Sequence, residues 1–229
     1  MSDVLIAIER WRREHAGGAA AVVAYGNLRS ISDTPALAEL KSTLVADLIT
    51  RFGTASRAEM VADPVLAAYE RYDRRFGQNY HVAMQIRSIA QKGKTIPARN
   101  VILEAMFMTE LATGVLAAAQ DLDVITLPIE IDSADGSESY ERYDGVTESC
   151  RTGDQFMRDA NGHILTSIAQ GPTNFGLVRE QTTRIAYCFY FPVDVPHDAR
   201  AAALTYLDRC VLAGNPAAQK IASVVIEAG

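Results

Sequence analysis

The hydrophobic pattern of this chain changes its period near Ile125, and that change constrains the fold more than any other feature of the sequence. Upstream, apolar residues recur at the spacing of amphipathic helices. Downstream, the stretch from Thr126 to Asp132 alternates apolar with polar side chains, as a half-buried strand does, and Asn161-Gly162 marks a hairpin turn. Helices followed by strands predict an α+β fold.

Helix-start signals and apolar runs place the elements. Thr34 before Pro35 and Asp63 before Pro64 each combine an N-cap side chain with a proline in the first turn, where the missing N–H costs nothing. The first start predicts a helix that ends near Phe52. Other predicted elements are a weak helix over Asp3–His15, a buried strand over Ala19–Tyr25, helices over Val65–Phe76 and Val82–Gln91, strands over His163–Ala169 and Arg184–Phe191, and a closing helix over Arg200–Leu212.

Length and charge narrow the class of protein. With 229 residues and 48% apolar content the chain can bury a sizeable core, and we expect a single domain over residues 1–229. The net charge of −6 argues against broad phosphate binding, because such binding depends on clustered Lys and Arg. Any contact with RNA must therefore be local.

The cysteines and the apolar runs argue against a disulfide-bonded, a metal-binding and a membrane-spanning protein. Cys150, Cys188 and Cys210 are far apart, with no Cys-x-x-Cys motif and no nearby His pair, so the sequence indicates neither a disulfide framework nor a metal site, and we expect no cofactor. No apolar run approaches the roughly 20 residues that cross a bilayer. We expect a cytoplasmic protein with reduced thiols and no membrane partner.

An ordered series of motifs resembles a known family. The series is Gly93-Lys94-x-Ile96-Pro97-x-x-Asn100, then Asp121-Leu122-Asp123, Gly153-Asp154-Gln155-Phe156 with Asp159, and Gly171 followed by Thr182-Thr183-Arg184. In this order they resemble the B3/B4 tRNA-binding and editing module of the phenylalanyl-tRNA synthetase beta subunit. The resemblance covers residues 65–212 and makes residues 1–64 a helical and strand part packed on that core.

The resemblance implies a fold and a partner. It implies a layered, mixed β-sandwich with flanking helices and a pocket between sheet and helix, in which the synthetase hydrolyses tyrosine wrongly attached to tRNA. The implied partner is tRNA or aminoacyl-tRNA, without DNA, and a homodimer is left open. The pocket requires the corner at Ile96-Pro97 and the glycine loop before Phe175 to share one cavity.

Several polar positions of the family's pocket differ in this chain. The family's Asp corresponds to Glu104, its Thr-Asn pair to Met106-Phe107, its His falls near Ala118, and its acidic strand residue falls near Cys188. A tyrosine hydroxyl left without a buried partner costs about 1–3 kcal/mol. We therefore do not expect tyrosine-specific editing, and an apolar pocket suits a different aminoacyl group or no reaction.

Each candidate site residue has a functional and a structural interpretation. Amides of the loop after Gly171 are candidates to stabilise an oxyanion, or the loop is a plain strand connection. Asn100 either holds a ligand or satisfies a turn amide, and Cys188 is either a pocket residue that could act as a nucleophile or an inert buried thiol. His81 and His163 are isolated, and His81, near the basic turn, is either a proton donor or an exposed or capping residue. The candidate catalytic residues are Gly171, Thr173 and Asn174, and the candidate substrate-binding residues are Asn100, Met106, Phe107, Thr183, Arg184 and Cys188. The candidate RNA-binding residues are Lys92, Lys94 and Arg99, whose alternative interpretation is solvated loop charges.

Two functions of different class follow. The first is an aminoacyl-tRNA-binding protein that could also hydrolyse the aminoacyl ester, so that enzyme status is undecided. The second is a non-catalytic binding module for an amino acid or a protein partner, which the adaptable Met106-Phe107-Met108 run favours. An unrelated α+β enzyme with the same order of motifs is a third reading.

Overall fold

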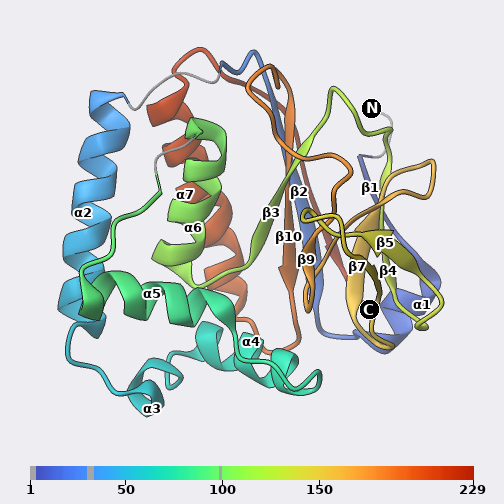
Figure 1. Ribbon diagram of the computed structural model, residues 1–229, viewed down its shortest axis with the longest axis horizontal. Coiled ribbons are helices and arrows are strands. Elements are labelled where there is room, and N and C mark those ends of the chain that lie inside the picture. Colours follow the sequence, from blue (N-terminus) through green and yellow to red (C-terminus); the bar gives the residue numbers. More distant parts are fainter. Residues whose placement is uncertain (1–3, 30–33, 98–99) are drawn as a thin grey trace. The chain divides into compact units, whose positions relative to one another are not determined.

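The computed structural model describes residues 4–29, 34–97 and 100–229, and these form two compact units (Figure 1). The sheet unit comprises Met1–Leu28, Ala118–Val193 and Gln219–Gly229. The helical unit comprises Arg29–Ala117 and Asp194–Ala218. Each unit is therefore assembled from segments that are far apart in the sequence.

The sheet unit contains two main sheets. The first has the strand order β11-β2-β10-β3, and the second has the order β1-β4-β7-β8-β9. A small hairpin of β5 and β6 completes the unit. The strand bounds are β1 Leu5–Ala7, β2 Ala19–Gly26, β3 Ala117–Asp121, β4 Ile129–Ser133, β5 Ser139–Glu141, β6 Thr147–Ser149, β7 Gln155–Arg158, β8 Ile164–Ser167, β9 Gly171–Pro172, β10 Ile185–Phe191 and β11 Gln219–Glu227.

The core of the sheet unit is the antiparallel pair β2 and β10, in which every residue is buried. Small residues of β2 lie opposite large aromatic residues of β10, as where Ala19 pairs with Phe191 and Ala20 with Tyr190. Strands buried on both faces read as continuous apolar runs, which is why both were predicted correctly from sequence. The Tyr190 hydroxyl also donates to the Thr166 carbonyl of the second sheet at 3.0 Å, so the two sheets form layers. The predicted α+β class with a layered sheet core is confirmed.

The N-terminal segment differs from its prediction. Residues Leu5–Ala7 form β1, parallel to β4, and only Glu9–Glu14 form a helix, α1. The helix predicted over Asp3–His15 is therefore wrong in its first turn. The short apolar run Leu5–Ala7 pairs with β4 instead, and strand pairing overrides a weak local helix pattern. Trp11 is the buried residue of α1, and its indole N–H donates to Gln155 Oε1 at 2.7 Å.

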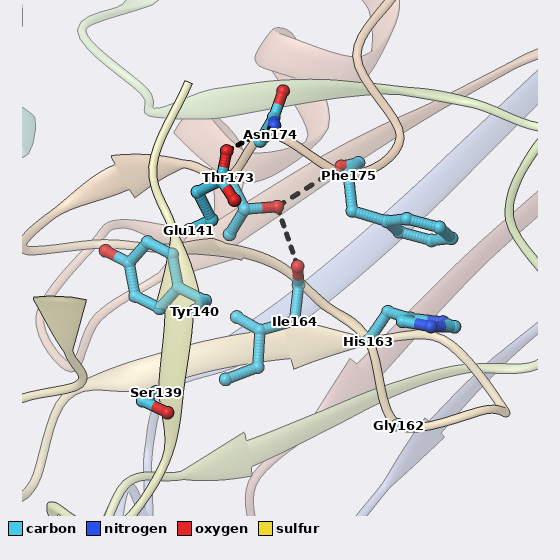
Figure 2. Close-up of a pocket in the computed structure, with 9 residues that line it drawn as sticks. All are labelled: Ser139, Tyr140, Glu141, Gly162, His163, Ile164, Thr173, Asn174 and Phe175. Atoms are coloured by element: carbon cyan, nitrogen blue, oxygen red, sulfur yellow. Dashed lines mark hydrogen bonds between the residues drawn. The ribbon is translucent and has the colours of Figure 1, made fainter. Parts of the chain in front are cut away.

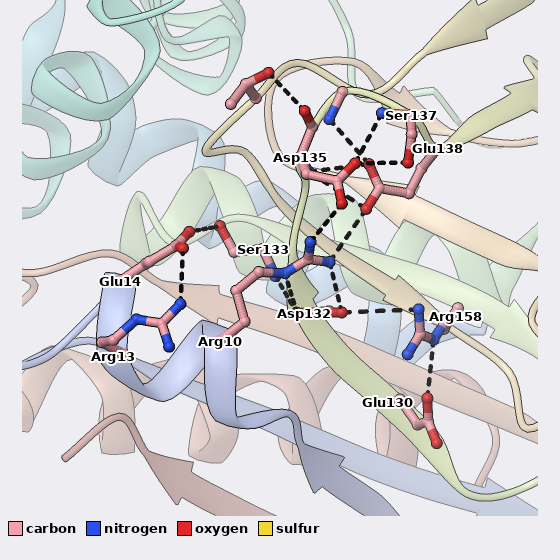
Figure 3. Close-up of polar contacts among 12 residues, drawn as sticks. Arg10, Arg13, Glu14, Glu130, Asp132, Ser133, Asp135, Ser137, Glu138 and Arg158 are labelled. Atoms are coloured by element: carbon pink, nitrogen blue, oxygen red, sulfur yellow. Dashed lines mark hydrogen bonds and ion pairs between the residues drawn. The ribbon is translucent and has the colours of Figure 1, made fainter.

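An arginine of α1 fastens that helix to the second sheet (Figure 3). The Arg10 guanidinium donates from Nε to Asp132 Oδ1 at 3.0 Å and from Nη2 to Asp132 Oδ2 at 2.8 Å, a bidentate pair. It also pairs with Asp135 at 2.8 Å and with Glu138 at 3.1 Å. On the neighbouring strand, Arg158 pairs with Glu130 and lies 3.7 Å from Asp132. The cluster balances a buried carboxylate with two guanidinium groups.

The helical unit follows the predicted helix starts closely. The Thr34 hydroxyl accepts from the Leu37 N–H at the start of α2, and the Asp63 carboxylate accepts from two amides at the start of α4. The predicted helices are thus confirmed, and α6 and α7 form the main helix pair of this unit. The helix bounds are α2 Pro35–Phe52, α3 Arg57–Met60, α4 Pro64–Arg74, α5 His81–Lys92, α6 Val101–Thr113 and α7 His197–Gly214.

A glycine sets the approach of α6 and α7. A Cβ atom added at Gly214 would collide with Val101 Cγ1 and would lie 3.3 Å from Leu37 Cδ2. The absent side chain therefore permits close packing of α7 against α6 and α2. None of the described helices combines the length and the apolar character that a bilayer crossing requires.

Candidate functional site

The sheet unit contains an open cavity of about 360 Å³ (Figure 2). Its walls come from three segments that are distant in the sequence: β5, the turn between β7 and β8, and the segment that follows β9. The lining residues are Ser139, Tyr140, Glu141, Gly162, His163, Ile164, Thr173, Asn174 and Phe175. Two of the three predicted catalytic residues, Thr173 and Asn174, are among them.

Both of these residues use their backbone amides inside the fold. The Thr173 N–H donates to the Leu165 carbonyl at 3.1 Å, and the Asn174 N–H donates to the Glu141 carbonyl at 2.7 Å. The Thr173 hydroxyl lies 2.7 Å from the Ile164 carbonyl (Figure 2). An oxyanion hole needs donors that point at the reacting group. These contacts favour the strand-connection interpretation for the two amides, while their catalytic role stays a prediction.

The third predicted catalytic residue, Gly171, begins β9 and pairs with Ser167 of β8. Its φ of +82° lies in the left-handed region that favours glycine. The residue therefore shapes the turn that carries Thr173 and Asn174 to the cavity.

The cavity presents a carboxylate and an amide side by side. Asn174 Nδ2 donates to Glu141 Oε1 at 2.7 Å, and both side chains are exposed. Among the residues that the structure describes, none bonds the second carboxylate oxygen of Glu141. The amide thus orients the carboxylate and leaves one oxygen able to accept a bond from a ligand.

A buried aspartate holds the histidine that lines the cavity. His163 Nδ1 lies 3.2 Å from Asp159 Oδ1, and its ring stacks on Phe175 with centroids 4.1 Å apart. Asp159 is itself fixed, since its carboxylate accepts from the N–H groups of Thr126, Asn161 and His163. A carboxylate at Nδ1 favours the tautomer with the proton on that nitrogen, so Nε2 becomes the acceptor. No described residue bonds Nε2.

Sequence reasoning missed Glu141 and His163 as site residues. In the sequence His163 is only an isolated histidine, and in the structure its side chain is 51% exposed. The available signal was the Asp159-x-x-x-His163 spacing across the Asn161-Gly162 turn, which brings a carboxylate back onto the imidazole. Glu141 had no such signal, because its partner Asn174 is 33 residues away.

Two predicted substrate residues meet at a different place in the sheet unit. Thr183 donates to Asp123 Oδ2 from its N–H at 2.8 Å, and Arg184 Nε donates to Asp123 Oδ1 at 2.7 Å. Burial alone would raise the pKa of Asp123, but these bonds outweigh it and lower the pKa to about 2. The Arg184 guanidinium therefore serves to order the Asp121-Leu122-Asp123 motif, and neither residue lines the cavity.

Cys188 lies in the middle of β10, with no exposed surface. Burial raises the pKa of its thiol to about 12, so the sulfur is protonated at neutral pH. This environment agrees with the structural interpretation of Cys188, which is an inert buried thiol.

The remaining predicted substrate residues lie on or beside α6 in the helical unit. Asn100 is the N-cap, and its side chain accepts from the Ile102 N–H at 2.9 Å, as in the structural interpretation. Met106 and Phe107 are half-buried. Glu104 is buried and pairs with Lys41.

The basic turn also belongs to the helical unit. Lys92 and Lys94 are exposed around Gly93, which ends α5 in the left-handed conformation. Arg99 lies outside the described residues. The cavity predicted between Ile96-Pro97 and the glycine loop involves residues of both units and stays a prediction. Within the described ranges, no group of three or more His, Cys, Asp or Glu side chains is placed to hold a metal ion.

The layered sheets and the helices define a class of α+β protein that is also found in a solved structure of a synthetase subunit. That structure is an N-terminal fragment of the phenylalanyl-tRNA synthetase beta subunit from Pyrococcus horikoshii, with a TM-score of 0.51 and 11% sequence identity. The similarity covers 93% of this chain and 49% of the fragment, so the chain spans about half of the fragment's length. At this identity the likeness is one of fold.

Comparison of the sequence with known proteins assigns the chain to no family. No protein-family model matches the chain, and no curated protein matches it. The resemblance noted from the motif order is therefore supported by fold alone.

Proposed function

We propose that this protein binds the aminoacylated 3′ end of tRNA and receives the aminoacyl group in the cavity at Glu141 and His163. The observation that carries the proposal is the fold: 93% of the chain matches a fragment of a tRNA synthetase subunit at a TM-score of 0.51. The motif order in the sequence points to the same subunit.

The chemistry of the cavity supports an aminoacyl ligand. An aminoacyl ester carries an ammonium group, and a carboxylate is a charge-assisted acceptor for it. Glu141, held by Asn174, offers one oxygen for that bond, while Phe175 and Ile164 supply apolar surface for the amino acid side chain. A volume of about 360 Å³ is at the lower end of the range for small-molecule sites.

The charge distribution supports a restricted RNA contact. A protein with a net charge of −6 does not bind phosphate broadly, so contact with the tRNA backbone must come from a small basic segment. Lys92 and Lys94 are exposed on one turn and supply such a segment. Recognition then depends mainly on the aminoacylated 3′ end of the tRNA. The phosphates of the tRNA contribute only at the basic turn.

A specific observation favours ester hydrolysis as a second candidate function. His163 has Asp159 on Nδ1 and leaves Nε2 open on the cavity wall, which is the arrangement of a general base that draws a proton from water. An aminoacyl ester is already activated, so an oriented water molecule and a base suffice for attack on its carbonyl carbon. The alternative is a binding module without chemistry, for an amino acid or a protein partner.

Binding is tested by comparing charged and uncharged tRNA in a filter-binding assay. We expect tighter binding of aminoacyl-tRNA, and loss of that preference when the ammonium is blocked by N-acetylation or when Glu141 is replaced in Glu141→Gln. Glu180→Gln, an exposed change in the same unit, is the matched control and should keep the preference. Equal affinity of the wild type for charged and uncharged tRNA would remove the proposal.

The RNA contact has its own test. The double change Lys92→Ala with Lys94→Ala should weaken binding to all tRNAs. The slope of the logarithm of the binding constant against the logarithm of the salt concentration should become smaller in magnitude by about one for each phosphate that the variant no longer binds. Arg179→Ala with Lys220→Ala removes the same charge from exposed positions elsewhere. If both pairs weaken binding equally, the basic turn does not bind the tRNA.

Hydrolysis is tested by release of the amino acid from a panel of charged tRNAs. Loss of a general base typically costs 10²–10⁴ in rate, so His163→Ala should lower deacylation at least about 100-fold. His197→Ala, at an exposed histidine of the helical unit, should leave the rate unchanged. A wild-type rate equal to the spontaneous rate leaves binding as the function.

A further inference from the structure

The helical unit contains a small hollow between α3 and α5. Its walls come from residues on both helices and at their ends, and from Glu70 of α4. Its volume of about 40 Å³ holds a few water molecules, since one water needs about 10–15 Å³ of such space. The hollow is therefore too small for a nucleoside, and it suits the oxygen atoms of one small ion.

Two arginines line this hollow, one from each helix. Arg57 on α3 donates from Nη2 to Glu70 Oε1 and to Asn79 Oδ1, the latter at 2.6 Å. Arg87 on α5 donates from Nε to Gln91 Oε1 at 3.0 Å. In the part of the chain that the structure describes, no residue bonds Nε or Nη1 of Arg57, or either Nη atom of Arg87. Each guanidinium group therefore keeps N–H donors for a ligand.

The carboxylate in the hollow is already occupied. Glu70 is buried, and its Oε1 accepts from Arg57 and from Arg74 Nε, the latter at 3.2 Å. Its Oε2 accepts from the Tyr80 N–H at 3.1 Å. Arg87 forms no ion pair with any carboxylate of the described residues. Three guanidinium groups thus gather around one carboxylate, and two positive charges stay uncompensated.

Most of the remaining lining of the hollow is apolar. Met60, Ala83 and Met84 contribute to it, and Met84 is 50% exposed. The nearby carboxylate of Glu59 accepts from the Ser56 N–H at 2.7 Å and is not part of the lining. An anion in the hollow therefore meets cationic donors and apolar surface. Apolar surroundings strengthen such bonds, because they lower the local dielectric constant.

The chemistry and the position of the hollow suit a phosphate group. Guanidinium groups match phosphate oxygens in geometry as well as in charge. Arg87 lies five residues before Lys92 on α5, which is about 7.5 Å along the helix axis. An RNA strand whose phosphates contact the basic turn at Lys92 and Lys94 is therefore within reach of the hollow.

We propose that the hollow between α3 and α5 is a site for one phosphate group, and that it holds a backbone phosphate of the tRNA beside the basic turn. The tRNA part of this inference rests on the proposed function. Arg57 and Arg87 then add to the two lysines of the turn as contacts for RNA. This gives a chain with a net charge of −6 one local surface that attracts phosphate.

Filter binding of tRNA to two carboxylate variants tests the site. Met84→Glu places a carboxylate in the hollow, where it pairs with the arginines in place of a phosphate. It should weaken tRNA binding about tenfold, the loss expected for one charge-assisted hydrogen bond. Leu212→Glu makes the same kind of change at an apolar residue of α7 that is 48% exposed, and it should bind tRNA as the wild type does. Equal affinities of the two variants would overturn the proposal.

The salt dependence of tRNA binding tests the contact of Arg87. In Arg87→Gln, the slope of the logarithm of the binding constant against the logarithm of the salt concentration should become smaller in magnitude by about one. Arg209→Gln, at an exposed arginine of α7, should keep the wild-type slope. Arg57 stays in place because it pairs with the buried Glu70. A slope that Arg87→Gln leaves unchanged would count against the site.

Inorganic phosphate tests the site without tRNA. A ligand that binds only the folded protein raises the midpoint of thermal unfolding. At equal ionic strength, sodium phosphate should raise this midpoint above its value in sodium chloride, and by more for the wild type and Leu212→Glu than for Met84→Glu. The general stabilisation that phosphate gives to folded proteins is common to all three and cancels in the comparison.

The phosphate site and the proposed function can fail separately. If phosphate stabilises the wild type more than Met84→Glu, but the wild type binds no tRNA, then the proposed function fails and the phosphate site stands. If the wild type binds tRNA, but neither tRNA nor phosphate distinguishes Met84→Glu from Leu212→Glu, then the site fails and the proposed function stands. Circular dichroism shows whether each variant keeps the fold.

Discussion

The replacement Glu110→Gln should remove most of a pH dependence in the stability of the helical unit. Glu110 is buried in α6, and its Oε1 accepts from the Ala117 N–H at 3.0 Å. Burial raises the pKa of this carboxyl from 4.5 to about 8, against a smaller lowering effect of the Ala117 bond. The folded protein therefore keeps this proton at neutral pH, whereas the unfolded chain releases it.

The sign and size of the effect follow from linkage. A group whose pKa is higher in the folded state contributes stability that is complete below pH 4.5 and is lost as the pH rises through about 8. Since one pKa unit is worth about 1.4 kcal/mol, the whole shift corresponds to about 5 kcal/mol, of which about 3.5 kcal/mol falls between pH 5 and pH 8. Glutamine keeps an acceptor for Ala117 and has no proton to lose.

Urea unfolding of wild type and Glu110→Gln from pH 5 to pH 8 measures this difference. The free energy of unfolding of the variant should gain about 3.5 kcal/mol relative to wild type over that range. His81 has its pKa lowered by burial and acts in the opposite direction, but it is present in both proteins and cancels in the difference. Burial raises the pKa values of Tyr69 and Tyr80, so both stay neutral in this range. Parallel pH profiles for the two proteins would refute the reasoning.

Three further changes test how each unit is stabilised internally, and all are measured by urea unfolding. Arg10→Met should cost about 2–3 kcal/mol, because it leaves the Asp132 carboxylate, 4% exposed, without its bidentate partner; a destabilisation below about 0.5 kcal/mol would contradict this. Gly214→Ala should cost about 1–3 kcal/mol through overpacking against Val101, and a neutral result would mean that the helices can separate freely. Asp63→Ala should cost about 1 kcal/mol because it removes the N-cap, while Asp63→Asn should retain most of the stability; equal effects would argue for a charge effect instead.

The parts of the fold that could be predicted are those that local chemistry determines. Thr34 and Asp63 start their helices by capping, which depends only on the next few residues. β2 and β10 are so uniformly apolar that burial on both faces follows from their composition. β11 was not predicted, although it lies beside β2, because its half-exposed pattern has meaning only once that neighbour is in place.

The candidate site was only partly predictable for the same reason. Thr173 and Asn174 were identified through the motif order and do line the cavity. The contacts of Glu141 with Asn174 and of His163 with Phe175 depend on how β5, β8 and β9 meet, and no local spacing encodes that arrangement. Arg184 was predicted as a substrate residue, and its contact with Asp123 could be known only from the structure.

The central place of β2 has a consequence for biosynthesis. Ala19 pairs with Phe191 on one side and with Glu227 on the other, so β2 finds its neighbours only after a long stretch of further chain has been made. Contacts of such large sequence separation slow folding, and an unpaired apolar strand is prone to aggregate. The apolar β2 segment therefore stays unpaired longer than α4 and α5, which can form from neighbouring residues alone.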